Sequence, residues 1–252
     1  MRLTDFDALT FDMIGTIIDS ETGILNWLRP RILPTHPKAS DSELLAAYAQ
    51  AQADVREADP KLLFSGRFPK MWDLIAARYD VEVQPEDGRS FMLSGRNWPP
   101  FADSLVALQR LKRIFPVLVV ATNGDRVSAR CHAATLGSPF TRVITEEDMG
   151  TYKPNRGAFE YFVGKVGELG IEKKRILHVA QSQYHDIGAA KEFGLATCWI
   201  YRRHGKEGEV SFPGPLGTYY GGTQALPQFT SPDFLALSLG HLADQVEASL
   251  LD

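Results

Sequence analysis

Residues 8–16 read Ala-Leu-Thr-Phe-Asp-Met-Ile-Gly-Thr, a stretch typical of a strand that ends at a site. An apolar run ends in one carboxylate, Asp12, and a Gly-Thr turn follows it. Such a run is typical of a buried strand in a parallel sheet, and ligands of open α/β sheets bind beyond the carboxyl ends of the strands. An isolated aspartate there often only caps a helix. At a strand end beside a ligand, however, Asp12 is a candidate covalent nucleophile.

Apolar runs of the same kind recur along the chain and alternate with helical patterns. The predicted strands are Ala8–Met13, Phe115–Ala121, Ile176–Ala180 and Ala196–Tyr201, with a shorter candidate at Arg142–Thr145. The helical patterns between them are Asp103–Arg113, Asp125–Leu136, Arg156–Val166 and Asp186–Phe193. Strands that alternate with helices predict an α/β fold, a parallel sheet covered by helices on both faces.

The block from residue 20 to residue 97 interrupts this alternation, because it contains helical patterns only. They lie at Thr22–Ile32, Asp41–Glu57 and Phe68–Tyr79. A helical block between the first two strands predicts an inserted α-helical cap domain, residues 20–97, on a core domain of residues 1–19 and 98–252. Beyond the core motifs, residues 203–231 are rich in Gly, Pro and Tyr and predict a loop. Pro232–Leu251 predicts a helix with an apolar stripe.

Composition and charge limit the classes of function. Lys and Arg total 27 against 31 Asp and Glu in 252 residues, a net charge of −4, so no nucleic-acid partner is expected. The two cysteines, Cys131 and Cys198, lack metal-binding spacing and are typical of free thiols in a reducing compartment. No apolar run reaches the roughly 18 residues of a membrane helix. We expect a cytoplasmic protein with a small-molecule substrate and no membrane partner; a homodimer is compatible with the sequence.

Three more polar signals follow strand ends or precede helices. Thr122-Asn123-Gly124 comes after the second strand, Lys153-Pro154 precedes a helix, and Asp186 follows the strand Ile176–Ala180. Each alone has an ordinary explanation: a turn, a surface lysine and a helix cap. Because they occur together at strand ends, however, these signals favour one site at the ligand-binding edge of the sheet.

Together with Asp12, these residues resemble motifs I to IV of the haloacid dehalogenase superfamily over residues 8–201. The resemblance implies a Rossmann-like core with a helical cap between the first strand and motif II. It assigns Asp12 as the nucleophile, Thr122 as the motif II residue, Lys153 as the motif III lysine and Asp186 as the motif IV acid.

Ile14 indicates which branch of the superfamily the chain resembles. Most members are phosphatases, whose second motif I aspartate, two residues after the nucleophile, gives a proton to the leaving oxygen. Ile14 stands at that position and cannot donate a proton. A halide leaves as a stable anion and needs only stabilisation of its charge. The dehalogenase branch also lacks the second aspartate, so the resemblance implies a hydrolase of the 2-haloacid dehalogenase type.

The implied mechanism has two covalent steps. Asp12 attacks C2 of a short 2-haloalkanoate, halide departs, and water positioned or deprotonated by Asp186 hydrolyses the ester to a 2-hydroxy acid. Lys153 would keep Asp12 ionised. The candidate substrate-binding residues are Met13, Ile14, Thr16, Thr122, Asn123 and Ser182, with Thr16 and Thr122 near the substrate carboxylate and Asn123 in the halide pocket. No metal or other cofactor is expected.

Several points stay open at the level of sequence. The dehalogenases use a cap arginine to hold the halide, and four arginines are candidates here: Arg29, Arg31, Arg56 and Arg67. The stretch before Asp186, Gln181-Ser182-Gln183, departs from the branch's Ser-x-Asn pattern. His178 is expected to be a core or satisfied polar residue. For His185 a surface or packing role is favoured over that of a proton shuttle. The alternatives are a magnesium-dependent phosphatase acting on a small metabolite, or a catalytically idle binding protein of the same fold.

Overall fold

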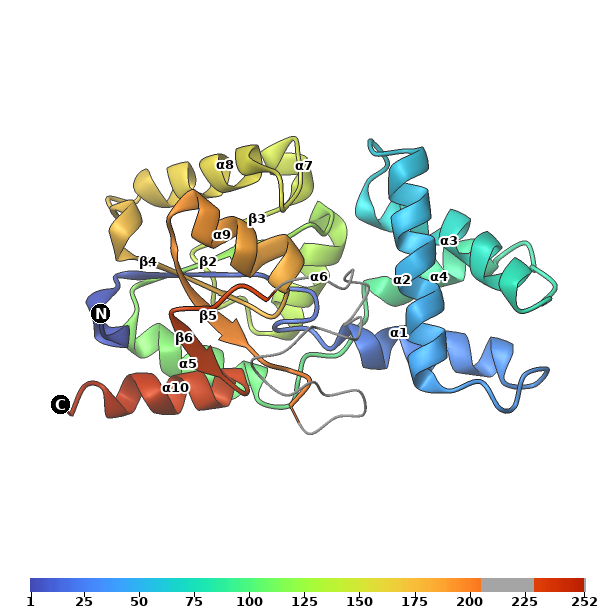
Figure 1. The fold of residues 1–252 in the computed structure, drawn as a ribbon, viewed down its shortest axis with the longest axis horizontal. Helices are drawn as coiled ribbons and strands as arrows, with labels where there is room; N and C mark the ends of the chain where they lie inside the picture. The colour runs from blue at the N-terminus through green and yellow to red at the C-terminus, as the bar shows by residue number, and fades with distance from the viewer. Residues whose placement is uncertain (205–228, 252) are drawn as a thin grey trace.

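The computed structural model describes residues 1–204 and 229–251, and its centre is a parallel sheet (Figure 1). The strands are β1 (Ala8–Phe11), β2 (Val117–Ala121), β3 (Arg142–Ile144), β4 (Ile176–Ala180), β5 (Ala196–Ile200) and β6 (Phe234–Ala236). They lie in the order β3-β2-β1-β4-β5-β6, and every pair is parallel. The first strand thus lies between β2 and β4, where the strand order reverses, and ligands of such sheets bind at that point.

Helices cover both faces of the sheet, as the sequence predicts. One face carries α5 (Ser104–Ile114), α6 (Arg126–Thr135) and α10 (Leu239–Ala248); the other carries α7 (Glu146–Met149), α8 (Arg156–Gly167) and α9 (Gly188–Phe193). Successive strand residues point to opposite faces, so Leu9 packs in one core cluster and Ala8 in the other. The α/β fold class with a Rossmann-like parallel sheet is confirmed.

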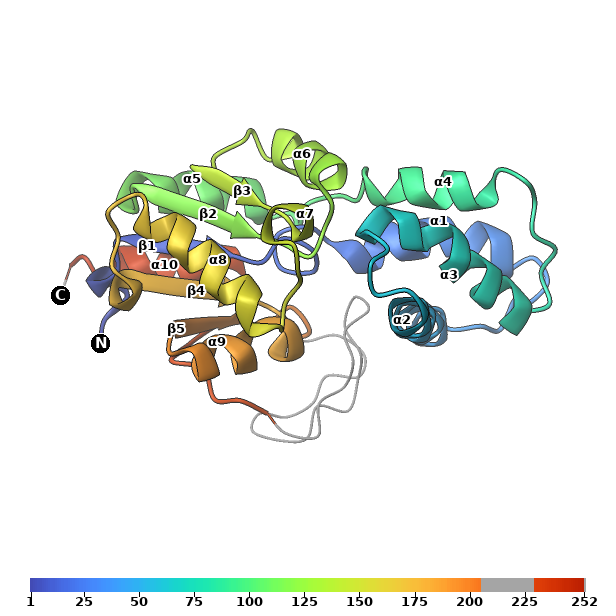
Figure 2. The same cartoon turned by 90° about the horizontal axis from the view of Figure 1, so that it is seen from above.

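A separate layer of four helices forms the cap, beyond the ends of the strands (Figures 1 and 2). The helices are α1 (Ser20–Ile32), α2 (Asp41–Ala58), α3 (Phe64–Arg78) and α4 (Asp87–Gly95), the last of which the sequence patterns missed. Ser40 and Glu43 form a capping box that begins α2. Stacked aromatic rings, among them Trp27 and Phe91, fill the cap interior. The helical cap is confirmed, whereas its boundaries at residues 20 and 97 stay a prediction.

The amino end of α3 fastens the cap to the core. The backbone N–H groups of Phe64 and Ser65 donate to the carboxylates of Glu146 and Asp125 in the core. Arg67 pairs with the same Glu146 at 2.9 Å, and both side chains are buried. Negative groups at a helix amino end are favourable because they satisfy its free N–H groups and complement its dipole. These contacts place Phe64 over the carboxyl edge of the sheet.

The carboxyl-terminal segment differs from the prediction. Phe234–Ala236 is the edge strand β6, paired with β5 from Cys198 onward, and only Leu239–Ala248 is helical. Leu242 and Val246 of the expected stripe are buried, but Leu237 is exposed. Whether such a short apolar run becomes a strand depends on its pairing with a strand elsewhere in the sequence. The periodicity of apolar residues alone does not show that pairing. Most of the loop predicted at 203–231 lies outside the described residues.

Two further observations concern membrane insertion and the cysteines. Within residues 1–204 and 229–251, no helix is long and apolar enough to cross a membrane. Cys131 and Cys198 are both free thiols, as expected.

Candidate active site

Asp12 leaves β1 directly and is held by the turn that follows it. Gly15 adopts a left-handed conformation with φ of 84°, which glycine tolerates without strain. The chain therefore folds back, and the Thr16 hydroxyl donates to Oδ2 of Asp12 at 2.8 Å. Thr16 in turn accepts from the backbone N–H of Gln181 at 2.9 Å. Thr16 thus positions Asp12 itself rather than lining the pocket, which corrects its predicted contact with a substrate carboxylate.

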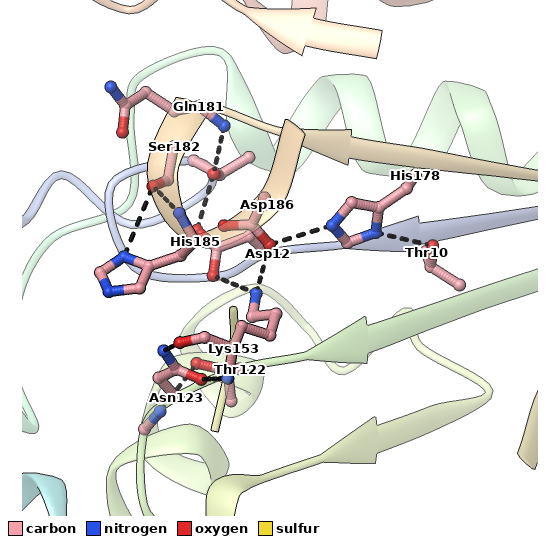
Figure 3. Close-up of polar contacts among 12 residues, drawn as sticks. Thr10, Asp12, Thr122, Asn123, Lys153, His178, Gln181, Ser182, His185 and Asp186 are labelled. Carbon is pink, nitrogen blue, oxygen red and sulfur yellow. Dashed lines mark hydrogen bonds and ion pairs between the residues drawn. The ribbon is translucent and has the colours of Figure 1, made fainter. Parts of the chain in front are cut away.

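Lys153 joins the two carboxylates of the site (Figure 3). Its Nζ lies 3.0 Å from Oδ1 of Asp12 and 2.6 Å from Oδ1 of Asp186, and its side chain is fully buried. The predicted triad of Asp12, Lys153 and Asp186 therefore meets at one point, although 141 residues separate Asp12 from Lys153 in the sequence.

Burial and neighbouring charges shift the pKa values of Asp12, Asp186 and Lys153 away from their usual values. Burial raises the pKa of Asp12, and the nearby charge of Asp186 adds to this, while Lys153 and Thr16 oppose it. Burial also acts to raise the pKa of Asp186, but Lys153 and a hydrogen bond from His178 lower it to about 2. Burial alone would lower the pKa of Lys153, but the two carboxylates raise it above its usual value. The site therefore holds an ammonium and an ionised Asp186 at neutral pH.

Asn123 holds the segment that carries Lys153. Its Nδ2 donates to the backbone oxygen of Lys153, and its Oδ1 accepts from the backbone N–H of Lys153, both at 2.8 Å. This reciprocal pair ties the end of β2 to the loop before α8. Thr122 is buried beside it, and its Oγ1 accepts from the N–H of Gly124 at 3.0 Å, which leaves the hydroxyl hydrogen free to donate.

A pocket of about 50 Å³ opens above Asp12 and is walled by both core and cap. The lining residues are Asp12, Ile14, Gly15, Tyr48, Gln52, Arg56, Phe64, Thr122, Asn123, Gln181, Ser182, His185 and Asp186. Tyr48, Gln52 and Arg56 come from one face of α2 at intervals of four residues, a spacing that marks a common helix face. Tyr48, Gln52, Phe64 and Gln181 were not predicted as site residues. For Tyr48 and Gln52, the four-residue spacing from Arg56 was a signal that could have found them.

Met13 is a correction to the predicted substrate contacts. Its side chain is fully buried within the main hydrophobic core. Asp12 and Ile14 face the pocket, and the residue between them points the opposite way, because successive side chains of extended backbone alternate in direction. Ser182, a predicted substrate contact, lines the pocket, and its hydroxyl accepts from the N–H of His185. His185, expected at the surface or in packing, also faces the pocket, and burial lowers its pKa to about 3.

The structure separates the four candidate arginines of the cap. Arg29 pairs with Asp41, Arg31 with Asp87 and Arg67 with Glu146. Arg56 alone of the four lines the pocket, where its guanidinium lies 4.3 Å from the ring centre of Tyr152. Its buried Nε has no hydrogen-bond partner among the described residues. A cation with a free buried donor in a pocket is suited to an anionic ligand.

The donor set does not match a metal site. Across the described part of the chain, no three His, Cys, Asp or Glu side chains are grouped so that they could hold a metal ion. Ile14 offers no side-chain oxygen, and the two carboxylates of the pocket are bridged by the ammonium of Lys153. Magnesium prefers several oxygen ligands in octahedral geometry, which these side chains by themselves do not supply.

A protein-family model matches residues 6–194, and its description is a haloacid dehalogenase-like hydrolase. The chain belongs to the haloacid dehalogenase-like hydrolases. An (S)-2-haloacid dehalogenase of Pseudomonas putida is 29% identical over 113 residues, 44% of this chain and 48% of that protein. The match thus spans about half the length of that relative.

Other members of the family carry a different activity. A 5-amino-6-(5-phospho-D-ribitylamino)uracil phosphatase of Escherichia coli (strain K12) is 28% identical over 211 residues, 79% of this chain and 84% of that protein. Among solved structures, the L-2-haloacid dehalogenase of Xanthobacter autotrophicus has a TM-score of 0.73 at 18% identity, with 96% of this chain and 99% of that chain covered. The similarity to this dehalogenase structure, at 18% identity, shows a shared fold alone. The similar proteins thus include dehalogenases and a phosphatase. The choice between these two reactions therefore has to be argued from the side chains of the site.

Proposed function

We propose that this hydrolase displaces halide from a short 2-haloalkanoate through an aspartyl ester on Asp12 and releases a 2-hydroxy acid. The observation that carries the proposal is Ile14, which lines the pocket beside Asp12 where an oxygen leaving group would need a proton donor. An apolar wall is compatible with a halide, which departs without a proton. It also keeps the attacking carboxylate poorly solvated.

In the first step, an oxygen of Asp12 attacks C2, and the carbon–halogen bond breaks with its electron pair leaving on the halide. Lys153 and Thr16 each hold one oxygen of Asp12, so the carboxylate is oriented before the substrate binds. Arg56 supplies positive charge at the cap side of the pocket, and we assign it to the substrate's anionic groups. The free hydroxyl hydrogen of Thr122 is a second donor for the substrate carboxylate.

In the second step, water attacks the carbonyl carbon of the Asp12 ester. Both donors of Asp186 bind its Oδ1, whereas Oδ2 has no partner among the described residues. Asp186 lines the pocket, so Oδ2 is the atom we assign to take the proton of the attacking water. The ester C–O bond then breaks, and the proton on Asp186 passes to the product oxygen. The second proton of the water is lost from the new Asp12 carboxyl to solvent, which regenerates the Asp12 carboxylate.

A magnesium-dependent phosphatase is the second candidate. The Escherichia coli phosphatase favours it, because that match covers more of this chain than the dehalogenase match does. The donor set favours dehalogenation, since Ile14 removes both the acid–base group and a carboxylate oxygen. A catalytically idle binding protein is the least favoured alternative, because the complete Asp12–Lys153–Asp186 cluster would then have no use.

The deciding experiment measures halide and phosphate release side by side. Chloro-, bromo- and fluoroacetate and 2-chloropropionate would be tested with and without excess chelator, together with a panel of small phosphate esters. We expect halide release that survives the chelator, because the ammonium of Lys153 already balances the carboxylates. Phosphate release that strictly requires magnesium, without halide release, would establish the second candidate instead.

Arg56→Met should raise KM for the haloacid. It removes the charge and keeps most of the apolar stem, so the expected loss is that of a charge-assisted hydrogen bond, about 1.5–3 kcal/mol or roughly 10–100-fold. The matched control is Arg29→Met, in the same cap but paired with Asp41 at the surface. Steady-state kinetics on 2-chloropropionate test this. An unchanged KM in Arg56→Met would remove Arg56 from the binding site.

Ile14→Asp should reduce halide release by at least about tenfold. The new carboxylate adds a like charge beside Asp12, which raises a carboxyl pKa, and a shift of one unit corresponds to about 1.4 kcal/mol. It also brings water into the pocket. We expect weak magnesium-dependent phosphatase activity to appear, because the missing acid–base group is restored. Ile14→Val, which stays apolar, is the control, and unchanged dehalogenation in Ile14→Asp would show that Ile14 has no role in selecting the reaction.

A further inference from the structure

His178 lies in the middle of β4, fully buried, and both of its ring nitrogens are hydrogen-bonded (Figure 3). Nε2 lies 2.9 Å from Oδ1 of Asp186, and Nδ1 lies 2.9 Å from the hydroxyl of Thr10. Thr10 is the register partner of His178 on the neighbouring strand β1. The ring is therefore held between Asp186 and Thr10, a residue of the neighbouring central strand.

The partners determine which nitrogen carries the proton. An ionised carboxylate only accepts, so Nε2 must donate to Asp186, and in the neutral ring Nδ1 then accepts from the Thr10 hydroxyl. The charged groups on this side are Asp186 and Lys153, which shares the same Oδ1. The remaining neighbours are uncharged: Phe159 and Phe162 of α8, whose ring centres lie 6.0 and 5.5 Å away, and Thr197 beside it on β5.

The two donors on Asp186 act at one oxygen. Because His178 and Lys153 both bind Oδ1, the carboxylate group is fixed in rotation, and Oδ2 is left as its buried and unpartnered acceptor in the described residues. Lys153 also binds Asp12. When Asp12 becomes a neutral ester, the position of Lys153 is no longer set by two carboxylates, whereas His178 stays where the strands hold it.

We propose that His178 is a positioning residue for ester hydrolysis, which holds Asp186 through Oδ1 so that Oδ2 faces the attacking water. This rests on the proposed function, because it concerns the second step of that reaction. The hydrogen bond from His178 also contributes to the low pKa of Asp186, so that this carboxylate is ionised at neutral pH.

The geometry predicts that the two steps respond differently to a change at His178. Asp12 is held by Lys153 and Thr16, and no hydrogen bond joins it to His178 in the described structure. Alkylation of Asp12 should therefore proceed without the histidine. Hydrolysis should slow, since it needs Asp186 in place to receive the proton of water while the oxygen of water bonds to the ester carbonyl carbon.

The test compares His178→Phe with His178→Gln on 2-chloropropionate. Phenylalanine keeps the ring packed against Phe162 and removes both polar atoms, whereas glutamine retains an N–H that can reach Asp186. For His178→Phe we expect a burst of one halide per enzyme at the wild-type rate, then turnover slowed at least about tenfold, the loss expected for one charge-assisted hydrogen bond. The lactyl ester on Asp12 should accumulate and be seen by intact mass. His178→Gln should recover most of the turnover.

Thr10→Val provides a second variant that is close to isosteric and keeps the histidine. Loss of the hydroxyl removes the partner that orients the ring, so a smaller slowing with the same ester accumulation is expected. Wild-type turnover without ester in both His178→Phe and Thr10→Val would overturn the inference, as would equal slowing of the burst and of turnover. No halide and no ester from the wild-type enzyme would instead overturn the proposed function, and this assignment with it.

Discussion

Asp12→Asn is expected to abolish turnover of 2-haloacids, with kcat reduced by more than about 10⁴-fold, as for removal of other covalent nucleophiles. An amide is a poor nucleophile at carbon. The structure adds a second reason, because both oxygens of Asp12 accept hydrogen bonds, from Lys153 and from Thr16. The amide nitrogen of asparagine would face a donor in one of these positions, so the group would be misplaced as well as unreactive.

The measurement is halide release by the purified variant, with intact mass to exclude deamidation back to aspartate. Asp73→Asn is the matched control, since Asp73 is exposed on α3 and far from the pocket lining. A near-wild-type rate in verified Asp12→Asn protein would refute covalent catalysis by this residue.

Lys153→Met should remove both activity and stability. Loss of the cation leaves two carboxylates buried without a counterion, and breaking a buried pair in this way costs about 3–5 kcal/mol. One carboxyl must then hold a proton at neutral pH. Because burial and Asp186 already raise the pKa of Asp12, we expect Asp12 to be that group. A protonated Asp12 cannot attack carbon, so the loss of kcat should be on the order of 10³-fold or more.

The pH dependence of stability tests the same prediction. In the variant, Asp12 has a folded-state pKa above its unfolded value, so the unfolded state releases a proton more readily and the variant loses stability as pH rises. Urea unfolding should therefore show a larger deficit relative to wild type at pH 7 than near pH 4.5. Lys165→Met is the control, since it removes a surface pair with Glu168 and a contact with the Tyr161 ring and leaves no buried carboxylate without a partner. A deficit equal at both pH values would mean that no buried charge is left uncompensated.

The layers of the fold could be predicted from the sequence because they depend on local patterns. Buried parallel strands such as Ile176–Ala180 are continuous apolar runs, and the cap is visible in the sequence as a strand-free block of helical patterns. The edge strand Phe234–Ala236 was not predicted, because three residues are too few to show a periodic pattern. Its strand conformation depends on pairing with β5.

Some site residues could likewise be predicted from the sequence, whereas others could be assigned only from the structure. Asp12, Lys153 and Asp186 were identifiable because, in their order along the chain and at strand or helix ends, they resemble the motifs of the haloacid dehalogenase superfamily. Arg56 could not be distinguished from three other arginines, because the difference lies in whether a carboxylate from elsewhere in the cap or core already pairs with each one. Met13 was misassigned, although the alternation of side chains along extended backbone places it opposite Asp12 and Ile14 and in the core.

The residue types alone specify the available functional groups: the carboxylates of Asp12 and Asp186, the amine of Lys153, and an apolar side chain at Ile14. Residue identity sets which atoms of a side chain can donate or accept hydrogen bonds. The folded arrangement is needed to see that Arg56 lines the pocket and that His178 is hydrogen-bonded to Asp186. Both follow from contacts between segments distant in the chain or from the direction of a side chain in packed structure, and these are set when the cap and the strands come together.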